Sequence, residues 1–147
     1  MEKELIAARL KLTKGESTRV WQIYEQYSAE MSKINGTKTA ILKEYSQKYD
    51  ALTDEQAEDL IRRWLETDVE QAKLLQQFAE IFRKVLSEKK VAAFLRLEQR
   101  TSKMTDAQLT SGLSPAQSEV WTVLVERGRL RRRETNRAVR FRVDEHE

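Results

Sequence analysis

The sequence predicts an all-α protein, an elongated helical hairpin or bundle of three to four helices, two of which are long. Charged residues make up 35% of the 147 residues and hydrophobic residues 39%, a balance typical of long solvent-exposed helices. Only four Gly and one Pro are available for turns, which is too few for a protein built from many strands. Apolar residues recur at steps of three and four over long stretches, the period of an amphipathic helix.

A first long helix is expected over about residues 14–48. Thr13 and Glu16 form a capping box, in which the Thr13 hydroxyl accepts from the Glu16 amide while the Glu16 carboxylate reaches back. The apolar stripe, which Lys38 interrupts, consists of Val20, Tyr24, Tyr27, Met31, Ile34, Ile41 and Tyr45. At 1.5 Å per residue this helix spans about 50 Å. We expect a kink at Gly36 rather than an end, because Gly costs about 1 kcal/mol inside a helix.

A second long helix is predicted to begin after Thr53, which forms a capping box with Gln56. Its first apolar stripe consists of Ala57, Leu60, Trp64, Leu74, Phe78, Ile81 and Val85. A second stripe beside it consists of Ile61, Leu65, Ala72, Leu75, Ala79, Phe82 and Leu86. So wide an apolar face needs cover on more than one side. A bound client would cover one stripe, and a homodimer interface is the simpler account.

The third predicted helix begins after Ser87 and ends near Lys103. Its apolar residues are Val91, Phe94, Leu95 and Leu97. Small and polar residues dominate the chain that follows, and they predict a linker over residues 105–113. We therefore expect one helical domain over residues 1–104.

Residues 114–147 are expected to form a short helix and an arginine-rich C-terminal extension. Ser114, with Pro115 at the first helical position and Gln117 two residues later, predicts the start of the helix. Gly128 predicts its end. Beyond it, apolar and basic residues alternate as in a strand, through Val139, Arg140, Phe141, Arg142 and Val143.

Enzymatic chemistry has few residues to carry it. The chain has no Cys and a single His, His146, so thiol catalysis, disulfides and thiolate metal sites are excluded and imidazole chemistry is not expected. Glu55, Glu58 and Asp59 are of the type that ligates a hard cation, but they are expected to lie on an exposed helix start among other charges. The carboxylates lack the apolar pocket or histidine partner that would indicate acid–base catalysis. No glycine-rich loop is present to hold a nucleotide phosphate. We predict no enzyme, catalytic residue, metal site or cofactor.

The sequence also bears on location. No window approaches the roughly 18 uninterrupted apolar residues of a membrane span, so no transmembrane segment is expected. The first ten residues lack the apolar core, about 7–15 residues long, of a secretory signal. The protein is therefore expected to be cytoplasmic if the chain is complete as written, or to have lost a signal peptide.

The run from residue 10 to about residue 100 resembles a known family. Leu52-Thr53-Asp54-Glu55-Gln56 matches the LTxxQ signature, and Leu12-Thr13-Lys14-Gly15-Glu16 is similar to a degenerate first copy of it. The aromatic and basic residues around these motifs fit the same pattern: Trp21, Tyr24, Tyr27, Tyr45, Tyr49, Phe82-Arg83-Lys84-Val85-Leu86 and Lys89-Lys90-Val91-Ala92-Ala93-Phe94. Together these segments resemble the Spy/CpxP family of bacterial envelope-stress proteins.

The resemblance implies a thin, curved helical fold, a homodimer and a periplasmic location. It further implies an ATP-independent chaperone that binds unfolded or envelope proteins, or a stress-signalling adaptor that recognises one envelope partner. For the motif residues themselves, helix capping is the role that their chemistry favours over binding. The capping residues are Leu12, Thr13, Glu16, Leu52, Thr53 and Gln56.

Several apolar residues are candidates for protein binding. Tyr24, Tyr27 and Met31 lie on the main stripe of the first helix, where packing against the second helix is the simpler role. Trp21 and Ile23 lie off that stripe and are better candidates for exposed contact. The candidates are therefore Trp21 and Ile23 together with Ile61, Leu65 and Phe82 of the second helix.

The basic residues divide unevenly along the chain. All twelve lysines lie at or before Lys103, whereas eight of the fifteen arginines lie in the last 21 residues. The eight are Arg127, Arg129, Arg131, Arg132, Arg133, Arg137, Arg140 and Arg142. They are enough for sequence-independent phosphate contacts, which makes binding of nucleic acid, or of an anionic membrane, an alternative function. A basic extension without a specific role is the third interpretation.

Overall fold

The computed structural model describes the backbone of residues 2–145 and the side chains of residues 3–140. Within that range the chain is helical and forms no strand. The elements are α1 (Glu2–Leu10), α2 (Lys14–Lys48), the 3-10 helix η1 (Tyr49–Ala51), α3 (Asp54–Phe82), α4 (Glu88–Thr110) and α5 (Pro115–Glu145). The all-α prediction is confirmed. The described residues form five α-helices rather than three to four, because α1 precedes the first helix that the sequence predicted.

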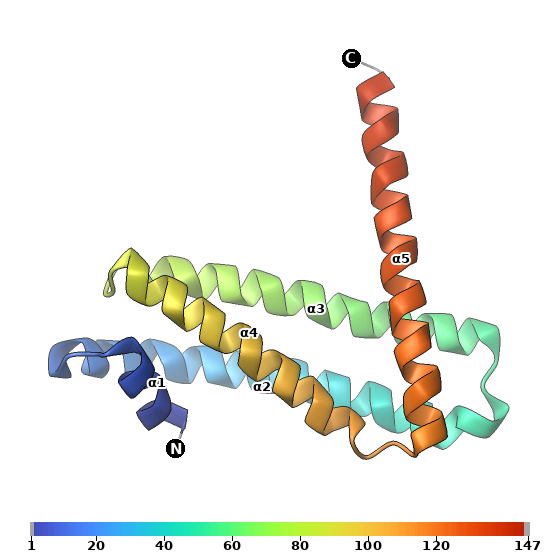
Figure 1. Ribbon diagram of the computed structural model, residues 1–147, viewed down its shortest axis with the longest axis horizontal. Coiled ribbons are helices and arrows are strands. Elements are labelled where there is room, and N and C mark those ends of the chain that lie inside the picture. Colours follow the sequence, from blue (N-terminus) through green and yellow to red (C-terminus); the bar gives the residue numbers. More distant parts are fainter. Residues whose placement is uncertain (1, 146–147) are drawn as a thin grey trace.

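Two long helices, α2 and α3, form an antiparallel hairpin. α2 and α3 lie side by side and are joined by η1, while α4 returns along the hairpin and α1 folds back against α4 (Figure 1). α5 crosses the other end of α3, and its C-terminal part projects away from the bundle (Figure 1).

Capping side chains set the starts of the helices as predicted. The Thr13 hydroxyl accepts from the Glu16 amide at 3.2 Å, and the Glu16 carboxylate accepts from the Thr13 amide at 3.0 Å. Thr53 and Gln56 repeat this pair of hydrogen bonds at the start of α3. Both LTxxQ-like motifs are therefore capping boxes, and α2 passes Gly36 without the end that a glycine can cause.

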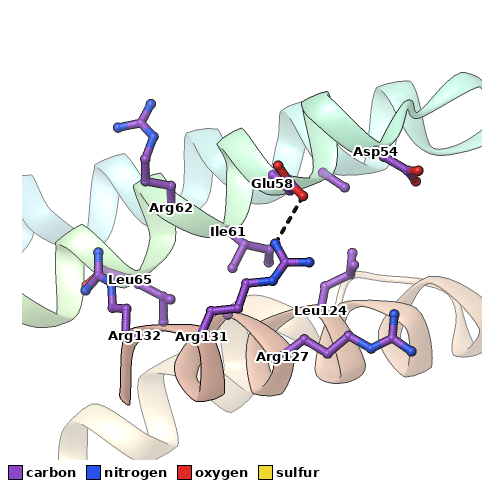
Figure 2. A pocket seen from close by; sticks show the side chains of 11 residues that line it. Asp54, Glu58, Ile61, Arg62, Leu65, Leu124, Arg127, Arg131 and Arg132 are labelled. Carbon is purple, nitrogen blue, oxygen red and sulfur yellow. Dashed lines mark hydrogen bonds and ion pairs between the residues drawn. The ribbon is translucent and has the colours of Figure 1, made fainter. Parts of the chain in front are cut away.

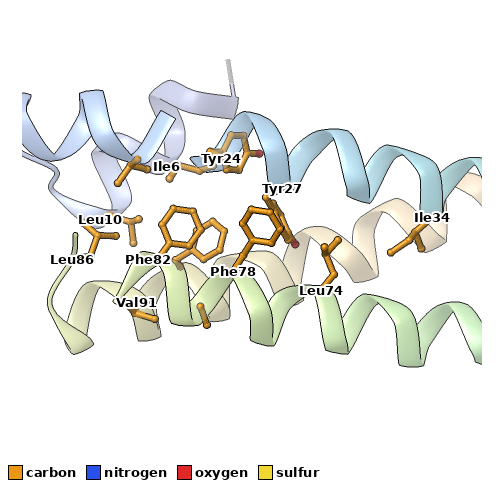
Figure 3. Packing of buried hydrophobic residues seen from close by; sticks show 13 residues of the cluster. Ile6, Leu10, Tyr24, Tyr27, Ile34, Leu74, Phe78, Phe82, Leu86 and Val91 are labelled. Carbon is orange, nitrogen blue, oxygen red and sulfur yellow. The ribbon is translucent and has the colours of Figure 1, made fainter. Parts of the chain in front are cut away.

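One apolar cluster fills the end of the hairpin that α1 and α4 close. Its centre is aromatic, with Tyr27 and Phe94 at 5.8 Å between ring centroids and Phe82 and Phe94 at 4.7 Å (Figure 3). Its buried members are Ile6, Leu10, Val20, Tyr24, Tyr27, Ile34, Leu74, Phe78, Ala79, Phe82, Leu86, Val91 and Phe94. α1, α2, α3 and α4 all contribute to it.

A second apolar cluster fills the opposite end, where α5 replaces α4 as the third helix. Trp121 of α5 packs between two aromatic rings. Its ring centroid lies 4.8 Å from that of Tyr45 and 5.3 Å from that of Trp64. The buried members are Ile41, Leu42, Tyr45, Leu60, Ile61, Trp64, Leu65, Trp121 and Val125. Residues after position 113 are therefore part of the packed bundle and not only an appendage to it.

Lys38 lies between the two clusters and is fully buried. Its Nζ donates to Asp106 at 2.7 Å and to Gln71 at 3.3 Å, and it lies 5.2 Å from the centroid of the Trp64 ring. Lys38 thus lies on the same buried face of α2 as the apolar residues of the stripe. Its charge can be buried there because Asp106 of α4 supplies the opposite charge. Asp68 of α3 lies 3.9 Å from the same ammonium group.

Three expectations for the C-terminal third are wrong. The predicted linker over residues 105–113 is mostly helical, since α4 continues to Thr110. One of its polar residues, Asp106, pairs with the buried Lys38. Gly128 does not end a helix but lies in the middle of α5. The alternating segment from Val139 is helical and not a strand. The side chains of Phe141 and Val143 lie outside the described residues.

Candidate binding site at the corner of α3 and α5

The apolar residues that the sequence singled out for partner contact are largely in the core. Phe82 is fully buried, and Ile61 and Leu65 are buried except where they line hollows beside α5. Trp21 and Ile23 are half-buried and pack against the first cluster. The second stripe of α3 is covered near Ile61 by α5 of the same chain, which removes the need for a partner at that position.

The crossing of α3 and α5 is close because of one glycine. A Cβ atom at position 128 would lie 3.1 Å from the Leu65 Cδ1 atom and nearer still to the Ile61 Cγ2 atom. Any side chain at this position would push the two helices apart. Gly128 is thus the contact point at which α5 turns away from the bundle.

Arginines that follow this glycine in the chain connect α5 to α3. Arg131 lies 3.1 Å from the Glu58 carboxylate, and the Arg132 guanidinium donates to the carbonyl oxygen of Leu65 at 3.2 Å (Figure 2). Arg129 lies 3.5 Å from Asp68. Because all three arginines have at least part of their surface in solvent, these contacts orient α5 more than they stabilise it.

Hollows flank the crossing on more than one side. The first, about 370 Å³, lies between the start of α3 and the middle of α5 and is lined by Ile61, Leu65 and Leu124 with Arg127, Arg131 and Arg132 around them (Figure 2). Asp54, Glu58 and Arg62 also line it, so that both charge signs are present.

The second hollow, here called the corner groove, lies where α5 leaves α3 and has a volume of about 410 Å³. Its apolar floor is formed by Leu65, Val69 and Ala72. Val69 is 43% exposed, which is high for an aliphatic side chain beside an interhelical contact. The polar lining consists of Asp68, Lys73, Gln76, Arg129, Arg132 and Arg133.

The corner groove is strongly basic. Four cations, Lys73 and three arginines, line it against the single carboxylate of Asp68, which gives a formal charge of 4 − 1 = +3. Asp68 is already engaged, since it lies near both Arg129 and the buried Lys38. An anionic side chain that entered the groove would therefore meet arginines with remaining donor capacity.

The predicted arginine cluster divides into two groups. Arg127, Arg129, Arg131 and Arg132 surround the crossing, whereas Arg133, Arg137 and Arg140 are exposed on the part of α5 that extends beyond it. The side chain of Arg142 lies outside the described residues. The described members thus lie on more than one side of α5, with Arg127 and Arg131 at one hollow and Arg129 and Arg133 at the corner groove.

A more polar hollow lies between α2 and α4. Its wall includes Tyr27, whose hydroxyl donates to the Glu98 carboxylate at 2.8 Å, and Gln71, which donates to the Ser102 hydroxyl at 2.7 Å. These bonds connect α2, α3 and α4 and account for polar residues on facing helix surfaces.

The described residues contain no group of three or more His, Cys, Asp and Glu side chains arranged to hold a metal ion. In the same part of the chain, none of the helices combines the length and the apolar character needed to cross a membrane.

Comparison of the chain with family models, with curated proteins and with solved structures gave no match. The likeness of residues 10–100 to the Spy/CpxP family therefore stays a prediction from the sequence.

Sequence reasoning named Leu65 of the groove floor as a binding candidate but missed Val69, Ala72 and the glycine that creates the corner. A signal was present for the glycine, since Trp121, Val125, Gly128 and Arg132 follow one another at steps of 4, 3 and 4. That spacing places Gly128 on the packed face of a continuing helix. Val69 and Ala72 carried no comparable signal, because only the direction of α5 makes them part of a site.

Proposed function

We propose that this protein is a non-enzymatic binding protein that holds segments of other polypeptides in the corner groove. The observation that carries the proposal is the combination of an apolar floor, Val69 and Ala72, with three arginines around it. Such a surface fits a short segment that offers an apolar side chain flanked by Asp or Glu. Unfolded chains present many segments of this kind.

The two kinds of contact have different roles. Burial of apolar area contributes about 25 cal/mol per Å², so the floor supplies the affinity. Arginines and Lys73 accelerate the encounter with acidic segments and orient them, which affects the association rate more than the affinity. We therefore expect added salt to slow binding more than it weakens it.

Flexible arginine side chains favour a range of related segments over one fixed partner. For that reason we favour holding of unfolded polypeptides over recognition of a single signalling partner. The resemblance to Spy/CpxP proteins supports the same choice, and with it a homodimer that acts on unfolded or envelope proteins in the periplasm. No reaction and no cofactor form part of this proposal.

The test uses the full chain, because residues after position 113 complete the second core cluster. Light scattering would follow the aggregation of a dilution-unfolded test protein at low and at moderate salt. The substitution Val69→Asp places a carboxylate on the groove floor and is expected to reduce suppression of aggregation several-fold. Val123→Asp is the matched control, since Val123 is similarly exposed, at 47%, but does not line the groove.

The outcomes separate the possible functions. Suppression by the native chain and by the Val123 variant, but not by the Val69 variant, would support holding at the corner groove. Equal suppression by all three would assign holding to another surface. No suppression at either salt concentration would overturn the holding function and leave a specific adaptor as the protein-binding alternative.

A further inference from the structure

The part of α5 beyond the corner carries a basic face that begins at Arg129 and Arg133 of the corner groove and extends past them. Arg133, Arg137 and Arg140 follow one another at steps of four and three, which places them on one face of the helix. Arg129 extends the same face toward the bundle. From Arg129 to Arg140 the face is about 16 Å long at 1.5 Å per residue.

This face is accessible from several directions. α5 projects from the bundle here (Figure 1), and every side chain from residue 133 to residue 140 is exposed. Among the described residues, Glu134 is the one carboxylate in this segment, and the described ion pairs include none of Arg133, Arg137 or Arg140. Three guanidinium groups therefore face solvent together at a cost in mutual repulsion.

We infer that this face binds the phosphate backbone of double-stranded nucleic acid without reading its sequence. Arginine is suited to phosphate because its planar guanidinium offers paired donors to two oxygens. An isolated helix of about 10–12 Å diameter fits the major groove of DNA, which is about 12 Å wide. Contacts to phosphates carry no sequence information, which agrees with a face composed of arginines.

A duplex suits the surface better than a single strand. Proteins that hold single strands generally stack the bases on aromatic side chains. Residues 127–140 contain no aromatic residue, and the side chain of Phe141 lies outside the described residues, so no described ring is available here for base stacking. An acidic protein is the competing occupant, and its binding is compared with that of the duplex.

The experiment measures how binding depends on salt. Anisotropy of a labelled DNA duplex of about 20 base pairs would be followed with the full chain between roughly 25 and 200 mM KCl. Three phosphate contacts predict that log K falls with log salt concentration at a slope of about −3. Replacing both distal arginines, Arg137→Gln/Arg140→Gln, removes two contacts and should bring the slope to about −1.

Two controls separate this inference from a general effect of charge. The variant Arg19→Gln/Arg96→Gln removes the same net charge from exposed positions elsewhere and should leave the slope unchanged. The variant Arg137→Lys/Arg140→Lys keeps both charges and should keep a slope near that of the native chain. Gln is nearly as good a helix former as Arg, and circular dichroism would verify that α5 stays folded.

Failure here is distinguishable from failure of the proposed function. The Arg137/Arg140 variants should still suppress aggregation, and Val69→Asp should still bind the duplex. No duplex binding at the lowest salt, or a slope that the distal substitutions do not change, would overturn the inference. Tighter binding of a polyglutamate peptide than of the duplex would assign the face to an acidic protein instead.

Discussion

The two parts of α5 show how one continuous helix can serve opposite purposes. In the first part, before the crossing, Trp121 is 3% exposed and Val125 is 8% exposed, and both complete a core that α2 and α3 leave open. In the second part every described side chain from residue 133 to residue 140 is exposed. The first part is determined by packing, whereas the second is free to carry charge.

The projecting part of α5 depends on the packed part for its helical structure, but the packed part does not depend on the projecting one. A polar helix of this length is marginal in water on its own, because nucleation fixes several residues for one hydrogen bond. The packed part supplies that nucleus, so the arginine face inherits its helical spacing from Trp121 and Gly128. Changes in the packed part should therefore alter both stability and the arginine face, whereas changes in the projecting part should alter binding alone.

The largest difference is expected for apolar truncation. Trp121→Ala removes an indole ring that packs against two aromatic rings, and should lower the free energy of unfolding by about 3–5 kcal/mol. Val139→Ala removes methyl groups from a side chain that is 54% exposed, and should change the free energy of unfolding by less than about 0.5 kcal/mol. Urea denaturation followed by circular dichroism would measure both. Equal losses would show that the projecting part also packs.

A pH titration would sharpen the same contrast. Burial, with a smaller effect of Tyr49, raises the pKa of Tyr45 to about 12. The hydroxyl also donates to the Gln117 carbonyl oxygen at 2.7 Å, so it connects α2 to the first turn of α5. Between the ordinary value of 10 and about 12 the unfolded chain has lost this proton and the folded chain keeps it. Stability should be complete below pH 10 and fall as pH rises toward 12.

The loss at Tyr45 is on the order of 3 kcal/mol, from about 1.4 kcal/mol for each of the two pKa units. Urea midpoints between pH 9 and 11.5 would follow the decline, and absorbance near 295 nm would follow tyrosinate formation. Tyr45→Phe should be less stable at neutral pH and show a shallower decline. A native decline as shallow as that of the variant would contradict the assignment to Tyr45.

Glycines in two helices provide the next test. Gly128→Ala places a Cβ against the buried, β-branched Ile61, and should destabilise the fold by about 1–2 kcal/mol despite the better helix propensity of Ala. Gly36→Ala meets nothing within 4 Å and should stabilise it by about 0.5–1 kcal/mol. Denaturant midpoints of the two variants should thus move in opposite directions. Stabilisation by both would mean that the helices do not meet closely at position 128.

Sequence reasoning reached much of the helical body because its signals are local. Capping boxes at Thr13 and Thr53, and the cap at Ser114, depend on residues three positions apart, and all three form as expected. The stripe of the first helix was also correct, since most of its residues are buried. These features needed no knowledge of which helices would meet.

The errors arose where a residue's role depends on a distant partner. Lys38 interrupts a stripe in the sequence, but Asp106 makes its burial possible. Gly128 resembles a helix end until its neighbour across the interface, Ile61, is known. The alternation after Val139 was too short to indicate a strand, because a helix that has already nucleated extends through it. Val69 and Ala72 could not be predicted as part of the groove floor, because only the direction of α5 places them there.

The smallest expected effect concerns the stability of the arginine face. Arg137→Gln should change the free energy of unfolding by less than about 0.5 kcal/mol, because the side chain is exposed and Gln suits a helix nearly as well. We expect a slight gain in stability, because the substitution removes like-charge repulsion between Arg137 and its neighbours Arg133 and Arg140. Urea midpoints at low and at high salt would test this, since screening should reduce the gain. A loss above 1 kcal/mol would show that the projecting part of α5 has a packing role that its exposed surface does not explain.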